Sequence, residues 1–245
     1  MKKQTVLITG ASSGIGKGIA KYFLDKGDNV VINSATAEKL HKAFEELGAL
    51  PNIAMVVGNI STKETGDQMV KVAIEKFGSV DVLVNSAGIF DTKPFLEVDE
   101  AYLDLFLDTN LKGTFFTTQS AITQMVKQNE GVIINIGSAL VNHGITEMAH
   151  SAQLVSKAAI NGLTYHLAAE FGKNNIRINT IAPGVIRTQM HNGNADENAS
   201  FHLLNRIGEV EDIAAMVYTV AKSQFTTGSI IHVDGGLGAG HSLHH

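Results

Sequence analysis

Short apolar runs alternate with longer amphipathic segments along the whole chain. The runs are rich in Val and Ile and apolar on both faces, as strands buried on both sides of a parallel sheet are. They are "TVLIT", "NVVIN", "IAMVVG", "VDVLVN", "GVIINIG", "IRINTIA" and "SIIHVDG". The segments between them predict helices near residues 15–26, 37–47, 63–77, 99–128, 150–172 and 210–221. The alternation predicts an α/β fold, with a parallel sheet covered by helices on both faces.

The same pattern bounds the domain organisation. No stretch of the 245 residues reads as an interdomain linker and no internal repeat appears, so we expect one domain over residues 1–240. Residues 241–245 are expected to be a tail that contains His241, His244 and His245. One stretch, "QMHNGNADENASF" at 189–201, is polar and rich in Gly and Asn, and it predicts a surface loop or lid.

Composition excludes several classes of protein. The net charge of −5 and the lack of a Lys/Arg cluster disfavour nucleic acid, whose phosphates require a basic surface. No apolar run approaches the roughly 20 residues that span a bilayer. The start "MKKQTVLITG" enters strand-like sequence too early for a signal peptide, so we expect a cytoplasmic protein. The absence of cysteine excludes disulfides, and the internal histidines lack metal-site spacing, so no metal is expected.

A glycine-rich turn, "LITGASSGIGKGIA", connects the first predicted strand to the first predicted helix. Gly10, Gly14 and Gly16 allow a tight turn and let backbone N–H groups approach a pyrophosphate, which the positive end of the helix also favours. Taken alone, such a turn is also explained as a plain strand-to-helix connection. Its position after the first strand of an alternating chain favours dinucleotide binding.

Several motifs follow in order along the chain. They are TGxxxGxG from Thr9, "NSAG" at 85–88, Asn110, Ser138, Lys157, "PGVIRT" at 183–188 and "HVDGG" at 232–236. Together they resemble the short-chain dehydrogenase/reductase family over nearly the whole chain. The resemblance implies a single-domain doubly wound Rossmann fold, with a seven-stranded sheet of order 3-2-1-4-5-6-7 and a nicotinamide dinucleotide across the carboxyl ends of its strands. The general rule for ligands of open α/β sheets gives the same location.

The resemblance assigns the cofactor to these motifs and to the strand ends beside them. The implied residues are Gly10, Ser12, Ser13, Gly14, Ile15, Gly16, Ser34, Thr36, Asn59, Ile60, Asn85, Ala87, Gly88, Lys157, Pro183, Gly184, Ile186 and Thr188. Asn59 stands where many relatives have an aspartate, and its amide oxygen can accept the same bond from the adenine amino group. The Ile186 N–H and the Thr188 hydroxyl are expected on the nicotinamide carboxamide.

The end of the second predicted strand bears on which dinucleotide is bound. NAD sites place a carboxylate there for the adenosine ribose, whereas this chain has "NSAT" at residues 33–36. A 2′-phosphate would meet no repulsion there, and the Ser34 and Thr36 hydroxyls can bind it. The arginine common in NADP sites is absent, and both hydroxyl residues are also explained as caps of the next helix. We predict NADP, with NAD as the alternative.

The reacting end of the site departs from the family pattern. Family members take the proton from a tyrosine four residues before the lysine, hold the carbonyl oxygen with a serine and link the lysine to solvent through an asparagine. By resemblance, Ser138, Lys157 and Asn110 fill the last three roles, although each residue type also has ordinary structural uses. Position 153 is glutamine, and its amide has no titratable proton near neutral pH. Gln153 can therefore orient a carbonyl but cannot act as a general acid.

His150 is the candidate replacement for the tyrosine. Residues 150, 153 and 157 share one stripe of a helix, and some enoyl reductases of this superfamily carry their tyrosine seven residues before the lysine. A histidine can shuttle protons near pH 7, but a histidine at a helix start is more often simply exposed. His143 and Glu147 either line the substrate pocket or are plain loop residues.

The sequence thus favours an NAD(P)(H)-dependent oxidoreductase that acts on a small carbonyl or alcohol through an unorthodox proton donor. The alternative is a cofactor-binding protein that has lost efficient turnover. The predicted helices at 99–128 and 150–172 carry more apolar positions than one stripe uses, which predicts a helical face shared between subunits of a homodimer or homotetramer. Examples of such positions are Phe106, Phe115, Phe116 and Leu167, and some of these must instead pack on the sheet.

Overall fold

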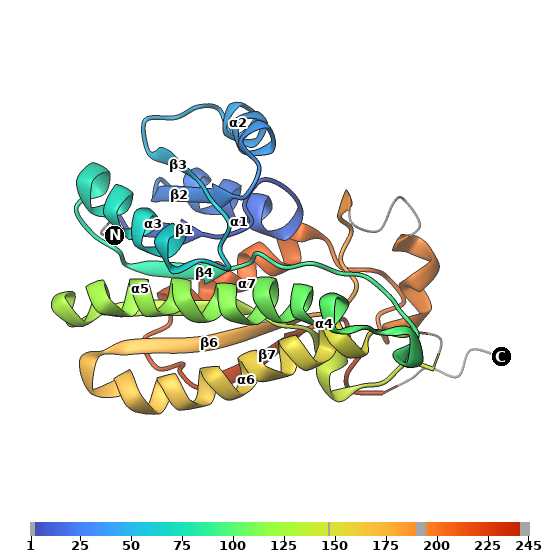
Figure 1. The fold of residues 1–245 in the computed structure, drawn as a ribbon. Helices are drawn as coiled ribbons and strands as arrows, with labels where there is room; N and C mark the ends of the chain where they lie inside the picture. The colour runs from blue at the N-terminus through green and yellow to red at the C-terminus, as the bar shows by residue number, and fades with distance from the viewer. Residues whose placement is uncertain (1–2, 147, 190–194, 241–245) are drawn as a thin grey trace.

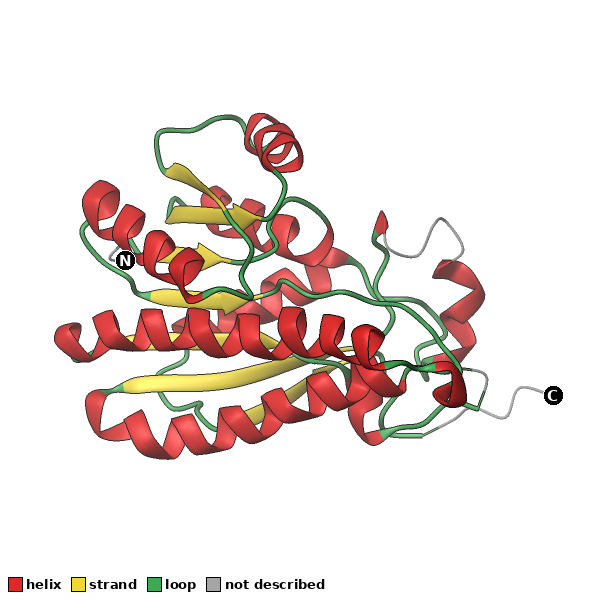
Figure 2. Ribbon diagram, in the orientation of Figure 1, coloured by secondary structure: helices red, strands yellow, loops and turns green. Residues whose placement is uncertain are grey.

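The structure, a computed structural model, describes residues 3–146, 148–189 and 195–240. These residues form one parallel sheet in the order β3-β2-β1-β4-β5-β6-β7, covered by helices on both faces (Figure 1, Figure 2). The strands are β1 (Thr5–Ile8), β2 (Asn29–Ser34), β3 (Ile53–Val57), β4 (Val82–Asn85), β5 (Gly131–Ile136), β6 (Ile176–Pro183) and β7 (Ser229–Val233). The predicted fold class and strand order are confirmed.

The helices follow the segments that the amphipathic pattern predicted. They are α1 (Gly14–Asp25), α2 (Ala37–Glu46), α3 (Lys63–Phe77), α4 (Glu100–Phe106), α5 (Gly113–Gln128), α6 (Ser151–Phe171) and α7 (Val210–Lys222). Shorter helical turns are η1 (Phe95–Glu97), η3 (Ala139–Asn142), η4 (Gly172–Asn174) and η6 (Ala195–Phe201). The long segment expected at 99–128 is α4 and α5 joined by a π-helical turn, η2 (Leu107–Lys112). Such turns are rare and are frequent at functional sites.

The core has two layers, one on each face of the sheet. Successive residues of β1 show this directly, because Val6 and Ile8 pack with α1, α2 and α7, whereas Leu7 packs with α3, α5 and α6. Phe23 of α1 anchors the first layer, and Met125 of α5 anchors the second. Strands that are buried on both sides have no polar face, which is why their sequences read as continuous apolar runs.

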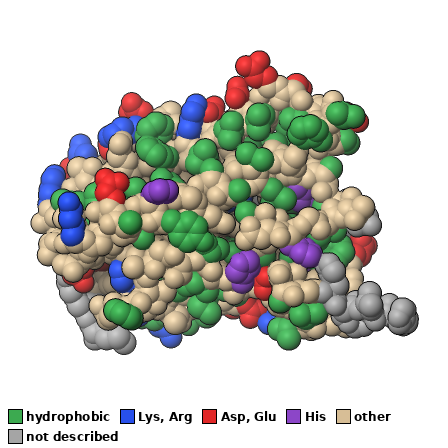
Figure 3. Space-filling view, turned by 90° about the horizontal axis from the view of Figure 1, so that it is seen from below, with side chains coloured by type: hydrophobic (Ala, Val, Ile, Leu, Met, Phe, Trp, Pro, Cys, Tyr) green, Lys and Arg blue, Asp and Glu red, His purple; other side chains and the backbone are tan. Residues whose placement is uncertain are grey.

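Only part of the predicted shared helical face lies on the surface. Phe106 is 1% exposed and packs on Tyr102 with ring centroids 5.1 Å apart, so it is one of the apolar positions that pack within the chain and is not available to a subunit interface. Leu167 packs against the core, whereas Phe115 is 45% exposed. α6 runs along the lower side of Figure 1, and the view from below in Figure 3 shows apolar side chains among mostly uncharged ones.

The polar stretch at 189–201 is more regular than its composition predicted. Residues 195–201 form the short helix η6 instead of an irregular loop. The remainder of this stretch at 190–194, Glu147 and the tail histidines lie outside the described residues. None of the helices in the described ranges is long and apolar enough to cross a membrane.

Candidate active site

The carboxyl ends of the strands surround a cavity of about 780 Å³. Its walls come from the segments that follow β1, β2, β3, β4, β5 and β6, and from the first turns of α6. The strand order reverses between β1 and β4, and both strands end at this cavity. This is where an open α/β sheet binds its ligand, and the volume is that of a small-molecule or cofactor site.

Most residues that the sequence singled out line this cavity. They are Gly10, Ser12, Ser13, Gly14, Ile15, Gly16, Ser34, Asn59, Ile60, Ala87, Gly88, Ser138, His150, Gln153, Lys157, Pro183, Gly184, Ile186 and Thr188. Asn85, Asn110 and Thr36 lie outside the lining. The structure therefore brings the glycine turn and the reacting-end residues, which are far apart in the sequence, to one cavity.

The glycine turn takes a backbone conformation that side chains resist. Gly10 has a φ of +66°, and a Cβ there would lie 2.6 Å from the Cα of Ala87, so this turn requires glycine. Gly14 has a φ of +52° and opens α1 beside the cavity. Ser13, the N-cap of α1, makes no side-chain cap bond, and the first turn of α1 carries no acidic residue. The turn thus offers uncapped N–H groups and the positive end of the helix to an anion.

The end of β2 presents a hydroxyl to the cavity and no carboxylate. The Asn33 amide is used in the fold, because it donates to the carbonyl oxygens of Val56 and Gly58, both at 3.0 Å. The Ser34 hydroxyl lines the cavity and accepts from the Thr36 N–H at 3.3 Å. Thr36 itself is exposed away from the lining. Among the described lining residues there is no Asp or Glu, so a 2′-phosphate would meet no negative side chain.

Two asparagines have partners that sequence reasoning did not anticipate. The Asn59 oxygen accepts from the Ser61 N–H at 3.0 Å, so one of its lone pairs already closes a turn. The Asn85 side chain is buried beneath the cavity, where it donates to Asn135 and to Thr118, both at 2.9 Å. Its side chain therefore ties β4 to β5 and α5, and the neighbouring "AG" residues border the cavity instead.

Lys157 is a buried cation at the end of β5. Its Nζ donates to the carbonyl oxygen of Ile136 at 2.8 Å, and burial lowers the pKa of Lys157 to about 8. A Cβ at Gly88 would lie 3.2 Å from this Nζ, so the glycine leaves the space that the ammonium occupies. A lysine with this pKa changes its charge within the working range of most enzymes.

Asn110 supports the site from the π-helical turn. Its Oδ1 accepts from the Ile89 N–H at 2.9 Å, and its Nδ2 donates to the Ser156 hydroxyl at 3.0 Å. Ser156 in turn donates to the carbonyl oxygen of Gln153 at 2.6 Å. Asn110 thus connects Ile89, in the segment after β4, to the first turns of α6. This chain of hydrogen bonds does not include Lys157.

The polar end of the cavity gathers three side chains. The Ser138 hydroxyl accepts from the Leu140 N–H at 3.2 Å and keeps its own proton free to donate. Gln153 and His150 are 8% and 4% exposed, and Gln153 Oε1 and His150 Nδ1 are buried without a hydrogen-bond partner. Burial lowers the pKa of His150, whose ring packs edge-on against Phe90 at 4.8 Å between centroids. Unpaired buried polar atoms are uncommon and indicate a place where a ligand is expected.

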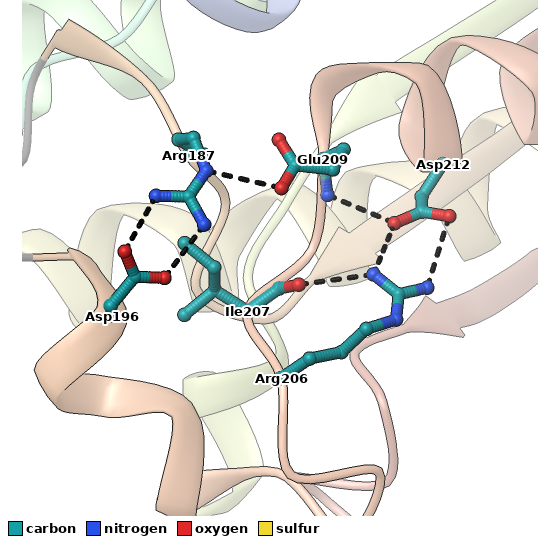
Figure 4. A network of polar contacts seen from close by, with 6 residues as sticks. All are labelled: Arg187, Asp196, Arg206, Ile207, Glu209 and Asp212. Carbon is teal, nitrogen blue, oxygen red and sulfur yellow. Dashed lines mark hydrogen bonds and ion pairs between the residues drawn. The ribbon is translucent and has the colours of Figure 1, made fainter.

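An exposed ionic network lies at the end of the 183–188 motif, most of which lines the cavity. Arg187 donates to Asp196 at 2.6 and 3.0 Å and to Glu209 at 3.1 Å (Figure 4). Arg206 donates to Asp212 at 2.8 Å and to the carbonyl oxygen of Ile207 at 3.0 Å. The ion pairs raise the pKa of Arg187 and Arg206 and connect the end of the 183–188 motif with η6 and the start of α7.

One wall of the cavity and one buried histidine belong to no sequence motif. Ile89, Phe90, Thr92 and Pro94 follow β4 and line the cavity. Their signal was only their place after a strand, because no motif marks them. His202 is 1% exposed and directly follows the stretch 189–201, whose composition predicted a surface loop or lid. His143, in contrast, does not line the cavity.

A doubly wound sheet with a glycine turn at its switch point defines a dinucleotide-binding α/β protein. The family model described as "Enoyl-(Acyl carrier protein) reductase" matches residues 10–238. With 3-oxoacyl-[acyl-carrier-protein] reductase FabG of Thermotoga maritima, the chain shares 34% identity over 97% of its length and 98% of that protein. The chain belongs to the short-chain dehydrogenase/reductase family of oxidoreductases.

Two further comparisons extend over almost the whole chain. It is 36% identical to the (2S)-[(R)-hydroxy(phenyl)methyl]succinyl-CoA dehydrogenase subunit BbsD of Thauera aromatica, over 96% of this chain and 97% of that protein. The solved structure of ElxO with NADP bound matches with a TM-score of 0.91 and 31% identity, over 98% of this chain and 100% of that chain.

Proposed function

We propose that this protein is an NADP(H)-dependent oxidoreductase that transfers hydride between the nicotinamide and a small carbonyl or alcohol. The observation that carries the proposal is that Ser138, Gln153 and Lys157 line the same cavity as the glycine turn. When bound, the cofactor supplies or receives the hydride. The residues of this chain bind the cofactor, orient the substrate and exchange the proton.

The residues present fit a phosphorylated dinucleotide. Gly10 permits a tight turn that any Cβ would block by contact with Ala87, and the uncapped start of α1 beside Gly14 would receive the pyrophosphate. Ser34 is the hydroxyl that would bind a 2′-phosphate, and the described lining holds no carboxylate to repel it. ElxO, which has NADP bound, supports the same choice. Pro183, Gly184, Ile186 and Thr188 are the residues proposed for the nicotinamide end.

Gly14→Val is expected to weaken NADP binding by at least about tenfold. Gly14 has a φ of +52°, which a β-branched residue strongly disfavours, and its added side chain would stand against Thr188. Isothermal titration calorimetry with NADP measures the effect. Gly162→Val is the control, because that α6 glycine has no atom within 4 Å of an added Cβ and lies outside the cavity. Normal binding by Gly14→Val would show that the pyrophosphate lies elsewhere.

The proton is proposed to come from His150. Gln153 has no acidic proton, so its amide can donate a hydrogen bond to a carbonyl oxygen beside the Ser138 hydroxyl but cannot release a proton. The His150 imidazole lines the same end of the cavity, and Lys157 is held by the Ile136 carbonyl. Because burial lowers the pKa of His150, the charged form that donates best is present only at pH values below its usual range.

His150→Ala is therefore expected to reduce carbonyl reduction by about 100-fold, the size typical of a lost general acid. The native rate should rise as the pH falls below about 6.5, where His150 gains its proton, and the variant should lose that rise. Steady-state NADPH oxidation across this pH range measures both effects. Full activity in His150→Ala would assign the proton to another group, and Ser151→Ala serves as a neighbouring control.

A transfer experiment separates this function from the alternative, a cofactor-binding protein with little turnover. The reaction of deuterium-labelled NADPH with a panel of aldehydes, ketones and oxo esters is followed by mass spectrometry. Deuterium in a product alcohol supports the oxidoreductase. Tight NADPH binding without transfer to any member of the panel would favour the binding protein, a role that the glutamine at position 153 motivates.

A further inference from the structure

We propose that His202 is a positioning residue that holds the 183–186 segment of the cofactor site, and that it does so only while its imidazole is neutral. The inference rests on the proposed function, because it assumes that NADP occupies the cavity bordered by this segment. His202 lies directly after η6, outside every family motif.

His202 contacts two loops, one in the motif "PGVIRT" at 183–188 and the other in the motif "HVDGG" at 232–236. Its Nε2 accepts from the Val185 N–H at 3.1 Å. A Cβ at Gly184 would lie 2.7 Å from this Nε2, and a Cβ at Gly235 would lie 3.2 Å from the Cβ of His202. The ring is thus wedged between two glycines whose hydrogen atoms leave it room. With 1% of His202 exposed, water cannot replace it as the partner of Val185.

The direction of this hydrogen bond fixes the protonation state. Because the Val185 N–H donates, Nε2 must carry no proton, and the imidazole is neutral. A proton on Nε2 would set one N–H against another and leave the buried Val185 N–H without a partner. Burial lowers the pKa of His202, which favours the neutral form. Of the charged side chains that act on it, Asp234 favours the proton and Arg206 opposes it.

The consequence reaches the cofactor through Gly184 and Val185, which line the cavity. Backbone bonds from Gly184 N–H to Val233 and from Gly208 N–H to Val185 hold this segment at 3.2 and 2.9 Å. These bonds persist when His202 is charged, so the segment should loosen without unfolding. NADP binding should therefore weaken at low pH. His202 supports binding above its lowered pKa, and this support is lost as the pH falls below about 6.5 toward that value.

Calorimetric titration with NADP between about pH 8 and pH 5 tests the inference. Between about pH 8 and pH 5 the native protein should lose about tenfold more NADP affinity than His202→Gln does. The Gln amide oxygen can accept the Val185 hydrogen bond but does not titrate. His202→Phe, which keeps a ring but no acceptor, should bind about tenfold more weakly even at pH 8. His166→Gln is the matched control, because this exposed histidine of α6 lies outside the cavity lining, and the variant should keep the pH dependence of the native protein. The 2′-phosphate titrates equally in all variants, so it cancels.

Two results would overturn the inference: the same pH dependence in native protein and His202→Gln, or native affinity at pH 8 in His202→Phe. Hydrogen exchange at the Val185 amide provides a readout without cofactor. Protection there should fall in His202→Phe and persist in His202→Gln, and equal protection in both would also refute the role of His202. Absence of NADP binding by native protein at pH 8 would instead refute the proposed cofactor, and the exchange measurement would still decide on His202.

Discussion

Gln153→Tyr is expected to increase carbonyl reduction by up to about 100-fold at neutral pH, where the lowered pKa of His150 leaves little of its protonated form and the new phenol would supply the general acid. The substitution would put a phenol on the first turn of α6, one helical turn before Lys157, on the wall that also carries Ser138. Lys157 is a buried ammonium with no described carboxylate in the cavity lining, so it would favour the phenolate and lower the pKa of the new tyrosine. NADPH oxidation with the best native substrate measures the gain.

Gln153→Phe separates the hydroxyl from the ring. Both variants place an aromatic ring at a position that is 8% exposed, so any crowding against the cavity wall should affect them equally. Only the phenol can donate a proton, and we expect Gln153→Phe to stay at or below the native rate. If the two variants behaved alike, the first turn of α6 would not face the reacting carbonyl, and the alignment of the site with the family would be wrong.

The fold was predictable because its determinants are local and periodic. The apolar runs predicted each strand to within a few residues. The glycine turn requires positive φ angles, which the glycines at positions 10 and 14 indicate in the sequence. The π-helical turn at 107–112 was not predictable, since its residues fit an ordinary helix and only tertiary packing selects the wider turn.

The site was predictable only where motifs mark it. The side chain of Asn85 belongs to a motif, yet it bonds Asn135 and Thr118 beneath the cavity, because a motif fixes position and not the direction of a side chain. His202 shows the opposite case. It belongs to no motif, and its partner Val185 lies 17 residues away, so only the folded chain reveals the contact. Contacts between distant loops leave no periodic pattern in the sequence, even where they support function.

Lys157→Met is expected to abolish reduction and yet to stabilise the protein below pH 8. Lys157 is buried at the cavity wall with a pKa of about 8, whereas a lysine in an unfolded chain titrates near 10.4. Below pH 8 the native protein therefore holds a buried charge that the unfolded chain solvates better, which destabilises it by about 3 kcal/mol. The Ile136 carbonyl would lose its donor at a cost of about 1–2 kcal/mol, so a net gain of about 1–2 kcal/mol remains.

The pH dependence of this gain is its signature. Between pH 8 and about 10.4 the unfolded chain binds more protons than the native one, so native stability rises with pH and the advantage of the Met variant should shrink. Thermal midpoints at pH 7 and pH 10 measure it, with an expected difference of about 2–8 °C at pH 7. Lys173→Met, on an exposed lysine just beyond α6, is the control and should change neither stability nor activity. A Met variant less stable than native protein at pH 7 would mean that the Ile136 contact outweighs the buried charge, and that the cation is held for the fold as much as for the reaction.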